Sequence, residues 1–429
     1  MRVYLESLGC KLNQSEMETL ARQFVAAGYE LVASAEAADL CVLNTCTVTH
    51  VAARKSRQAT HRLRRLNPDA YLVVTGCYAE LASEPFAADL VVGNEDKARL
   101  FDLARSKSDQ RPATSQQPAA GVRPLPTRTR AFVKIQDGCD NTCTYCIVRV
   151  ARGRQRSRPR AEILAEICAR VTEGYKEIVL TGVHVGAYGR DSGEASPDNL
   201  RSLVTDILAE TAVPRLRLSS IEPWDLSPDF FELWQSPRLC RHLHLPLQSG
   251  CDATLQRMDR RYTTTTFARI VSAARQAIPG VAITTDLIVG FPGESEVEFA
   301  ASYEFVAQMA FARLHVFPYS ARPGTLAAAM PGQVPHAVKK ARARQMIALG
   351  QQMADQFRRA FVGQTLEVLW ERGRNTARGC TWSGLTDNYI RVTATSETDL
   401  GNSLLPTRLI AVTSGGMRGV LGGQEQRFS

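Results

Sequence analysis

Residues 137–146 read Asp-Gly-Cys-Asp-Asn-Thr-Cys-Thr-Tyr-Cys, and this stretch decides how the rest of the chain is interpreted. Cys139, Cys143 and Cys146 follow a Cys-x3-Cys-x2-Cys spacing, with no fourth cysteine nearby. Soft thiolate ligands suit iron–sulfur clusters, and three of them hold three irons of a [4Fe–4S] cube. The fourth iron then keeps an open coordination position, which a catalytic metal needs. The spacing therefore predicts a catalytic [4Fe–4S] cluster in this loop.

A zinc knuckle or a chance grouping of cysteines is the alternative. Zinc usually takes four ligands, often from Cys-x2-Cys pairs, and the nearest histidines are His61 and His184. The ferredoxin run has another spacing and a Pro after its last cysteine, whereas Ile147 follows Cys146. The iron–sulfur interpretation is therefore favoured.

The composition is that of an ordinary globular protein. The 429 residues are 44% hydrophobic and 22% charged, and this length suits two or three domains. We expect no membrane span and no signal peptide, because no long apolar run occurs and the N-terminus is not of the secretory type. Without an export signal, we expect the protein to be cytoplasmic. In that reducing compartment its eleven cysteines favour metal sites over disulfides.

The net charge of +9 is concentrated in three basic runs. Residues 54–65 and 149–160 each carry six Lys or Arg and no acid, and residues 339–344 carry four. Such runs suit nucleic-acid phosphates, although any single run is more often a solvated helix face. The first two runs closely follow cysteines, and this favours an RNA partner.

The first 105 residues alternate strand and helix patterns, which implies a doubly wound parallel sheet. Strands are expected at 2–8, 38–44, 70–75 and 90–92, and helices at 13–27 and 48–66. Cys10, Cys46 and Cys77 each follow a strand, at the sheet edge where ligands bind. We expect these thiols to form a second [4Fe–4S] site. The alternative is that all three are buried small hydrophobes, as we interpret Cys41 within its strand.

Six strand–helix units from Ala131 to about Ala354 predict a partial (β/α)6 barrel. Its strands are expected at 132–136, 177–181, 215–219, 242–247, 282–289 and 314–317, and helices at 160–173, 199–210, 265–277 and 294–309. Barrel ligands bind at the C-terminal strand ends, and the cysteine loop follows the first strand. Later strand ends carry small or polar residues that suit a bound ligand, namely Thr181, Ser220, Glu222, Gln248 and Gly290.

The last part of the chain predicts a long helix and then a small β-barrel. The helix is expected at 334–361 and the short strands at 365–370, 389–394, 409–412 and 419–421. Seven arginines against six acids in residues 360–429 leave this part nearly neutral. Composition alone therefore does not separate an RNA-binding barrel from a capping domain.

The motifs together resemble the radical S-adenosylmethionine (SAM) methylthiotransferases. Residues 8–14 (Leu-Gly-Cys-Lys-Leu-Asn-Gln), 44–49 (Asn-Thr-Cys-Thr-Val-Thr) and 75–79 (Thr-Gly-Cys-Tyr-Ala) are similar to the family's N-terminal domain. The 139–146 loop is similar to the radical-SAM signature, and 151–158 to the family's basic loop. The resemblance implies an N-terminal methylthiotransferase domain at 1–105, a linker at 106–130, a radical-SAM barrel with a trailing helix at 131–361, and a TRAM-like β-barrel at 362–424.

The resemblance also implies the cofactors, which are SAM and two [4Fe–4S] clusters. Cys139, Cys143 and Cys146 would ligate the cluster that cleaves SAM, and the auxiliary cluster that carries the sulfur would be held by Cys10, Cys46 and Cys77. SAM contacts are implied for Tyr145, Thr181, Ser220, Glu222, Gln248 and Gly290. No side chain is singled out as a general acid or base.

Within this family the chain looks most like the branch that converts N6-threonylcarbamoyladenosine beside the tRNA anticodon to its 2-methylthio derivative, using two SAM and cluster-borne sulfur. The implied partners are the anticodon stem-loop and an electron-donating reductase, and a monomer is expected. Ser15 stands where this branch often has an aromatic residue, and Arg149-Val150 where the family usually has Pro and an aromatic.

Three alternatives to this function stay open. Two are other branches of the same family, which act on isopentenyladenosine in tRNA or on an aspartate of a ribosomal protein. The third belongs to another class: a non-catalytic iron–sulfur protein that binds RNA or transfers electrons.

Overall fold

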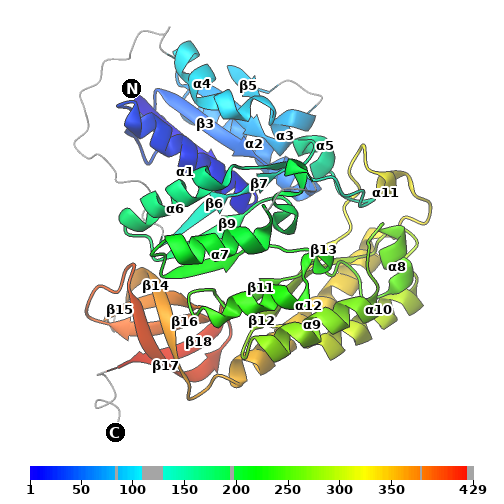
Figure 1. Cartoon of the computed structure of the whole chain (residues 1–429). Helices are drawn as coiled ribbons and strands as arrows, with labels where there is room; N and C mark the ends of the chain where they lie inside the picture. The colour runs from blue at the N-terminus through cyan, green and yellow to red at the C-terminus, as the bar shows by residue number, and fades with distance from the viewer. Residues whose placement is uncertain (83–85, 109–128, 194–197, 377–378, 423–429) are drawn as a thin grey trace. The chain divides into compact units, whose positions relative to one another are not determined.

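The computed structural model describes residues 1–82, 86–108, 129–193, 198–376 and 379–422 (Figure 1). The chain forms two compact units, each built from several segments. Unit 1 comprises Met1–Thr127, Asp137–Arg156 and Ser320–Ala328, and unit 2 comprises Arg128–Gln136, Ser157–Tyr319 and Ala329–Ser429. Both predicted cysteine trios therefore belong to unit 1. The predicted linker at 106–130 lies almost wholly outside the described residues, and the predicted domain boundaries stay a prediction.

The core of unit 1 is a parallel sheet with strand order β2-β1-β3-β4-β5. The strands are β1 (Arg2–Ser7), β2 (Glu30–Leu31), β3 (Leu40–Thr45), β4 (Tyr71–Gly76) and β5 (Leu90–Val92). Every residue of the central strand β3 is buried, as expected for a parallel strand that is covered on both faces.

Helices cover both faces of this sheet, which confirms the predicted doubly wound arrangement (Figure 1). One apolar layer contains residues of α1 (Lys11–Ala26) and α4 (Leu100–Ser108), and the other contains residues of α2 (His50–Leu66). The sequence did not predict α4, nor the short helices α3 (Cys77–Leu81) and α5 (Val148–Arg152) of this unit.

Unit 2 contains six parallel strands in two sheets, β10-β9-β6 and β11-β12-β13. The bridge between Ser220 and His244 joins the two sheets, so the six strands form the predicted partial barrel. The strands are β6 (Arg130–Lys134), β9 (Glu177–Thr181), β10 (Arg215–Leu218), β11 (His242–His244), β12 (Ala282–Val289) and β13 (Arg313–Pro318).

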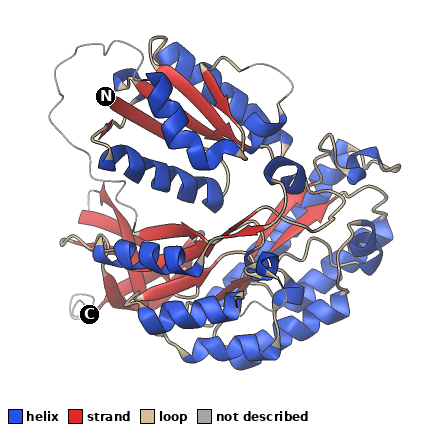
Figure 2. Cartoon of the chain, turned by 45° about the horizontal axis from the view of Figure 1, so that its top comes forward, coloured by secondary structure: helices blue, strands red, loops and turns tan. Residues whose placement is uncertain are grey.

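The helices of unit 2 pack against these strands in one continuous hydrophobic core (Figure 2). They are α6 (Arg160–Thr172), α7 (Leu200–Glu210), α8 (Asp252–Arg257), α9 (Thr264–Ala277), α10 (Glu296–Met309) and α12 (His336–Arg359). Three short elements fall at the segment boundaries between the units, namely β7 (Gln136–Asp137), β8 (Arg156–Ser157) and α11 (Leu326–Ala329).

The C-terminal strands close into a small barrel with the order β14-β15-β16-β18-β17. They are β14 (Thr365–Thr376), β15 (Gly379–Thr386), β16 (Arg391–Ser396), β17 (Leu404–Thr413) and β18 (Gly416–Leu421). The barrel has its own core around Trp370, Val392 and Leu409. The predicted α/β fold with a small C-terminal β-barrel is therefore confirmed. Within this barrel the sequence did not predict β15, and elsewhere it did not predict the two-residue strands β2, β7 and β8.

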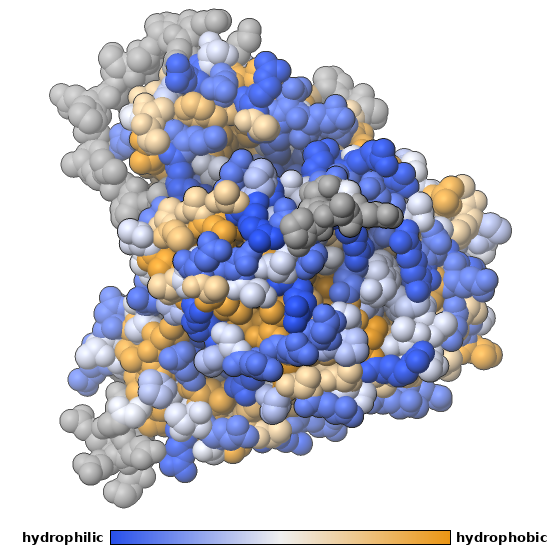
Figure 3. Space-filling view, in the orientation of Figure 1, coloured by the Kyte–Doolittle hydropathy of each residue, from blue (hydrophilic) through white to orange (hydrophobic). Residues whose placement is uncertain are grey.

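No helix among the described residues combines the length and apolar character that a membrane crossing needs. The face of the molecule in Figure 3 is a mixture of hydrophilic side chains and smaller hydrophobic patches.

Candidate iron–sulfur and SAM site

Three loops at the C-terminal edge of the unit 1 sheet bring Cys10, Cys46 and Cys77 together. Cys10 caps α1, Cys46 follows β3, and Cys77 begins α3 directly after β4. Cys46 and Cys77 are only 7% and 5% exposed. Desolvation raises the pKa of the Cys46 thiol, and the nearby Cys10 and Cys77 raise it further. Thiols in such surroundings ionise at neutral pH only when a cation or a metal compensates.

Two glycines in these loops allow the close approach. Gly9 has φ +101°, and a Cβ there would lie 2.9 Å from Cys46 Sγ. Gly76 has φ +99°, and a Cβ there would lie 2.3 Å from Asn44 Oδ1 and 2.4 Å from the carbonyl oxygen of Thr45. A side chain at either position would therefore force the cysteine loops apart.

Asn13 is the polar link between these loops, although only its place in the 8–14 motif was noted from the sequence. Its amide Nδ2 donates to the carbonyl oxygen of Leu8 at 2.7 Å and to that of Thr45 at 3.0 Å. Its Oδ1 lies 3.7 Å from Cys10 Sγ, which donates to it. Asn13 is 1% exposed. One side chain therefore fixes the loop before Cys10 against the residue before Cys46.

The second trio lies in the loop between β7 and α5. Cys139, Cys143 and Cys146 are partly buried, and the backbone N–H of Cys146 donates to the carbonyl of Cys143 at 3.0 Å, which closes a tight turn. The loop is also held from outside, because the backbone N–H of Ala327 donates to the carbonyl of Thr144 at 2.8 Å.

The segment Ser320–Ala328 touches both cysteine loops of unit 1. Ala327 binds Thr144 of the second trio's loop, as described above, while Arg322 reaches the loop of the first trio. Arg322 Nη2 donates to Thr47 Oγ1 at 2.6 Å, and its Nη1 lies 3.3 Å from His50 Nδ1. Thr47 directly follows Cys46. A segment remote in sequence therefore ties the two loops together.

The donor sets fit iron–sulfur clusters better than a single zinc ion. All eleven cysteines are free thiols. Among the described residues, neither trio brings three ligand atoms within 4.8 Å of one another, a spacing that is met only by His244, Asp286 and His315. Ligands of one zinc ion converge on a common point, whereas the thiolates of a cube bind different irons.

The predicted SAM contacts other than Tyr145 lie in unit 2, at the C-terminal ends of its strands. Thr181 ends β9 and is buried. Gly290 follows β12 with φ +69°, and a Cβ there would lie 2.4 Å from Lys339 Cγ. Tyr145 belongs to the cysteine loop of unit 1. The assignment of these residues to SAM stays a prediction.

Gln248 has a left-handed backbone, with φ +64°. Its N–H donates to the carbonyl of Asp286 at 2.8 Å, and its own carbonyl accepts from the N–H of Ile288 at 2.9 Å. A non-glycine residue rarely adopts this conformation, and such strain is concentrated at ligand sites. The role of Gln248 as a SAM contact stays a prediction.

Glu222 has a structural partner. The guanidinium of Arg260, whose side chain is 1% exposed, binds both carboxylate oxygens of Glu222. Arg260 also lies over the rings of Trp224 and Tyr262, at 4.8 and 5.1 Å from their centroids. A buried guanidinium requires an acid, so neutralising Arg260 explains Glu222 without a ligand. Ser220 forms the bridge between β10 and β11.

A polar triad on β11, β12 and β13 was not expected from the sequence. Asp286 lies between two imidazoles, with Oδ1 3.1 Å from His315 Nδ1 and Oδ2 3.3 Å from His244 Nε2. Burial would raise the pKa of Asp286, but hydrogen bonds from the two histidines outweigh it and hold the pKa below its ordinary value. Asp286 is 29 positions from His315 and 42 positions from His244 in the sequence, so strand pairing alone reveals the cluster.

The basic runs are partly used for internal ion pairs. In the third run, Arg342 is buried against Glu294 at 2.7 Å. In the second run, Arg158 pairs with Glu166 at 2.7 Å, and Arg160 binds both Asp198 and Asp206. These runs are therefore not the uniform basic surfaces that the composition suggested.

The first run differs because most of its cations face solvent. It lies on α2, where Arg62 pairs with Glu6 and Arg64 with Asp89. The run has four further cations, Arg54, Lys55, Arg57 and Arg65. All four are exposed, and none forms an ion pair with another described residue. The exposed face of α2 is consequently the cationic surface best suited to a polyanion.

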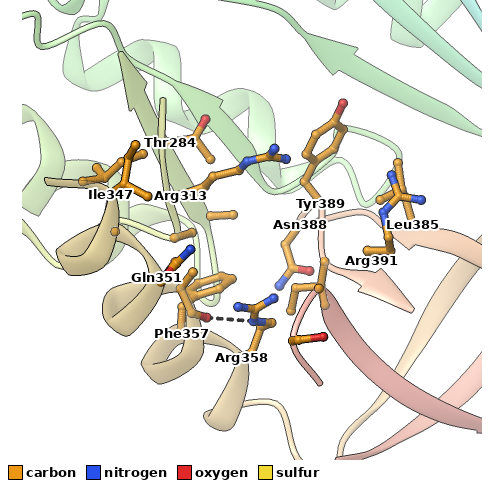
Figure 4. A pocket seen from close by; sticks show the side chains of 18 residues that line it. Thr284, Arg313, Ile347, Gln351, Phe357, Arg358, Leu385, Asn388, Tyr389 and Arg391 are labelled. Carbon is orange, nitrogen blue, oxygen red and sulfur yellow. Dashed lines mark hydrogen bonds between the residues drawn. The ribbon is translucent and has the colours of Figure 1, made fainter. Parts of the chain in front are cut away.

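Unit 2 contains a cavity of about 460 Å³, whose lining side chains are shown in Figure 4. None of the predicted SAM contacts lines it. It is lined by residues of α12, of β12 and β13, and of the C-terminal barrel, including Thr284, Gln351 and Asn388. Thr284 belongs to the first half of β12, whereas Gly290 follows the other end of that strand. This cavity is therefore at the opposite strand ends from a barrel active site.

Two family models match the chain. Residues 2–93 match the Uncharacterized protein family UPF0004, and residues 133–306 match the Radical SAM superfamily. Among solved structures, the radical S-adenosylmethionine methyltransferase TsrM from Kitasatospora setae shares the fold, with a TM-score of 0.57 and 16% identity over 76% of this chain and 77% of that one.

Curated relatives match along nearly the whole chain. Threonylcarbamoyladenosine tRNA methylthiotransferase MtaB of Bacillus subtilis (strain 168) is 38% identical over 95% of this chain and 93% of its own length. The protein of the same name from Thermotoga maritima is 38% identical over 86% of each chain. A tRNA-2-methylthio-N(6)-dimethylallyladenosine synthase from Moorella thermoacetica is 35% identical over 85% of each.

The superfamily match first defines the class, which is that of the radical SAM enzymes, and these work with SAM and [4Fe–4S] clusters. Within this class the chain belongs to the methylthiotransferase family, because the relatives span its length at well over 30% identity. The resemblance seen in the motifs is thereby confirmed.

Proposed function

We propose that this protein is a tRNA methylthiotransferase that converts N6-threonylcarbamoyladenosine beside the anticodon to its 2-methylthio derivative. The main structural support is the placement of two cysteine trios in one compact unit, with the segment Ser320–Ala328 bound to both loops. An enzyme that makes a radical at one cluster and takes sulfur from another needs both sites close to one substrate.

The two cysteine trios would hold two different clusters. Cys139, Cys143 and Cys146 would hold the cluster with the open iron, and Cys10, Cys46 and Cys77 the auxiliary cluster. When bound, the first cluster supplies the electron that cleaves SAM, and the second supplies the sulfur. Cys46 and Cys77 are buried, whereas Cys10 is exposed, so the auxiliary cluster would be covered on one side and accessible beside Cys10.

SAM itself would be bound at the strand ends of unit 2. Gln248 and Gly290 would line this site, since both stand at the strand ends, Gln248 with a left-handed backbone and Gly290 without a side chain. Thr181 would add a hydroxyl. Ser220 and Glu222 have structural roles that suffice to explain them.

The choice of branch rests on the relatives. Four proteins named for threonylcarbamoyladenosine are 35–38% identical to this chain, and four named for dimethylallyladenosine are 34–35% identical. These ranges are close, so the substrate must be tested directly. The anticodon stem-loop would meet the exposed cations of α2, and an external reductase would supply the electrons.

Mass spectrometry of tRNA nucleosides from cells that lack this protein tests the proposal. The methylthio derivative of threonylcarbamoyladenosine should disappear, its unmodified precursor should accumulate, and the plasmid-borne gene should restore the product. Loss of methylthio-isopentenyladenosine instead would assign the protein to the sister branch. An unchanged profile of both would reject a role in tRNA methylthiolation.

The purified protein separates an enzyme from a binding protein. With a reductant and SAM, the reconstituted protein should release 5′-deoxyadenosine, and the variant with Cys139, Cys143 and Cys146 replaced by Ala should release none. A wild-type protein that binds tRNA but forms no 5′-deoxyadenosine would support the non-catalytic alternative.

A further inference from the structure

Arg152 is a buried cation between the two cysteine sites of unit 1. It is the last residue of α5, six positions after Cys146, and its side chain is 2% exposed. Removing a guanidinium from water is costly unless ion pairs and hydrogen bonds replace the lost hydration. The ion pairs and hydrogen bonds of Arg152 therefore indicate its role.

Two carboxylates and one amide oxygen bind the terminal nitrogens of the Arg152 guanidinium. Nη1 lies 2.9 Å from Glu16 Oε1 and 2.9 Å from Asp137 Oδ1. Nη2 donates to Asn13 Oδ1 at 2.6 Å. Glu16 and Asn13 belong to α1, whereas Asp137 stands two residues before Cys139. The guanidinium thus joins the helix that follows Cys10 to the start of the second cysteine loop.

The remaining donor of Arg152 points at a predicted cluster ligand. Nε donates to Cys77 Sγ at 3.2 Å. A neutral thiol is a weak acceptor, whereas a thiolate is a charged one that gains from a cationic donor. Arg152 also touches Asn13 Oδ1, which lies 3.7 Å from Cys10 Sγ. Arg152 therefore contacts one sulfur of the first trio directly and a second through Asn13.

The neighbours of Arg152 bind the second trio. The carbonyl of Gly153 accepts from the backbone N–H of Cys139 at 3.2 Å. Gly138 packs so closely on this segment that a Cβ there would lie 1.9 Å from the carbonyl oxygen of Arg154. On the other side, Asn94 Nδ2 donates to the carbonyl of Ala151 at 2.5 Å. The consecutive residues Arg152 and Gly153 thus reach both cysteine sites.

We propose that Arg152 is a positioning residue of the auxiliary cluster, which holds the Cys77 thiolate by a charged N–H···S hydrogen bond and couples that site to the Cys139 loop. The proposal rests on the proposed function, because it takes Cys10, Cys46 and Cys77 as cluster ligands. Hydrogen bonds to the sulfurs and local net charge set the reduction potential of such a cluster. Arg152 provides both, so it favours the reduced form of the auxiliary cluster.

Lysine is a poor substitute at this position. An ammonium is a compact charge without the rigid planar fork, so it holds fewer of the four partners at the same time. Arg152→Lys keeps the charge and loses the fork, Arg152→Gln keeps donors and loses the charge, and Arg152→Met loses both. The three variants therefore separate charge from hydrogen bonding.

The test is performed on the full-length, anaerobically reconstituted protein. In Arg152→Met the reduction potential of the auxiliary cluster should become more negative. The reduction potential of the cluster on Cys139, Cys143 and Cys146 should stay constant. The shift should be smaller in Arg152→Lys. Electron paramagnetic resonance in a redox titration distinguishes the two clusters when each is also measured alone, in variants that lack the other trio.

The matched control is Arg149→Met, which removes an exposed guanidinium from the same helix and should leave iron content and both potentials unchanged. If Arg152→Met binds less iron, the loss should come only from the auxiliary site, and Arg152→Lys should restore it in part. Wild-type iron content and wild-type potentials in both Arg152→Met and Arg152→Gln would overturn the proposal. A wild-type protein without an auxiliary cluster would instead contradict the proposed function.

Discussion

At the scale of single residues, the cysteines outside the two trios differ in their environments. Cys41 packs within the core between the unit 1 sheet and α2, and Cys240 is 1% exposed in unit 2. Burial raises the pKa of both thiols to about 12. Cys168 is exposed on α6. Burial thus separates Cys41 and Cys240 from Cys168 in their expected reactivity.

This difference predicts which thiols alkylate. In native protein at pH 8, Cys168 should react readily with iodoacetamide, while Cys41 and Cys240 should stay unmodified because they remain protonated and buried. Peptide mass spectrometry gives the modified fraction at each site, and denatured protein provides full labelling as the control. Rapid modification of Cys41 or Cys240 in the native protein would contradict the packing described for them.

The sequence revealed the ligand candidates at this scale but not their partners. The positions of Cys10, Cys46 and Cys77 follow from one rule, since each comes just after a parallel strand. Arg152 lay in a run of six arginines that looked like one basic surface. Its contact with Cys77 joins residues 75 positions apart. Only tertiary packing shows that this arginine is buried while Arg149 and Arg154 are exposed.

At the scale of elements, β9 and β12 were predicted with correct bounds. β9 is centred on the apolar run Ile-Val-Leu, and β12 has apolar residues at both of its ends. β11 was expected to extend to residue 247, but it ends at His244, because Pro246 has no N–H for the ladder. β15 was missed because Gly-Cys-Thr-Trp-Ser-Gly-Leu-Thr has a weak strand pattern. It exists because β14 and β16 pair with it on both sides.

A buried ion pair joins β9 and β10. Arg217 Nε lies 2.7 Å from Glu177 Oε1, and both side chains are 0% exposed. Arg217 Nη1 also donates to the carbonyl of Asp387 at 2.8 Å, in the turn between β15 and β16 of the C-terminal barrel. Burial would raise the pKa of Glu177, but the charge of Arg217 outweighs it and keeps the pKa below its ordinary value.

Removing one partner of this pair should destabilise the protein strongly. Arg217→Met leaves an uncompensated buried carboxylate, and we expect a loss of about 3–5 kcal/mol. Arg201→Met is the control, because the Arg201–Glu232 pair is 44% and 60% exposed and should contribute less than about 1 kcal/mol. Urea unfolding of both variants gives the comparison, and equal losses would contradict the role of burial.

The same pair predicts a pH dependence. Because the pKa of Glu177 is lowered on folding, its contribution is fully present above the unfolded value of about 4.3 and is lost as the pH falls through the lower folded value. The stability difference between wild type and Glu177→Gln should therefore be constant near neutral pH and shrink below about pH 4. A difference that grows in acid would contradict this sign.

At the scale of the whole molecule, the order of the α/β segments and the β-barrel could be predicted because each has its own hydrophobic periodicity. Parallel strand–helix units predict α/β layers, and short strands after a long helix predict a small β-barrel. The sequence did not reveal that residues 137–156 and 320–328 belong to the same compact unit as the N-terminal sheet. That membership depends on contacts such as the one between Arg322 and Thr47, which are 275 positions apart.

The central claim is that unit 1 carries two separate [4Fe–4S] sites, one on each cysteine trio. The most direct test is the iron content of anaerobically reconstituted protein, measured with Mössbauer spectra for wild type and two triple variants. Replacing Cys10, Cys46 and Cys77 with Ala should remove about half the iron, and replacing Cys139, Cys143 and Cys146 should remove the other half. The control variant Cys168→Ala should retain the full iron content. Full iron content in either triple variant, or zinc in place of iron, would contradict the account.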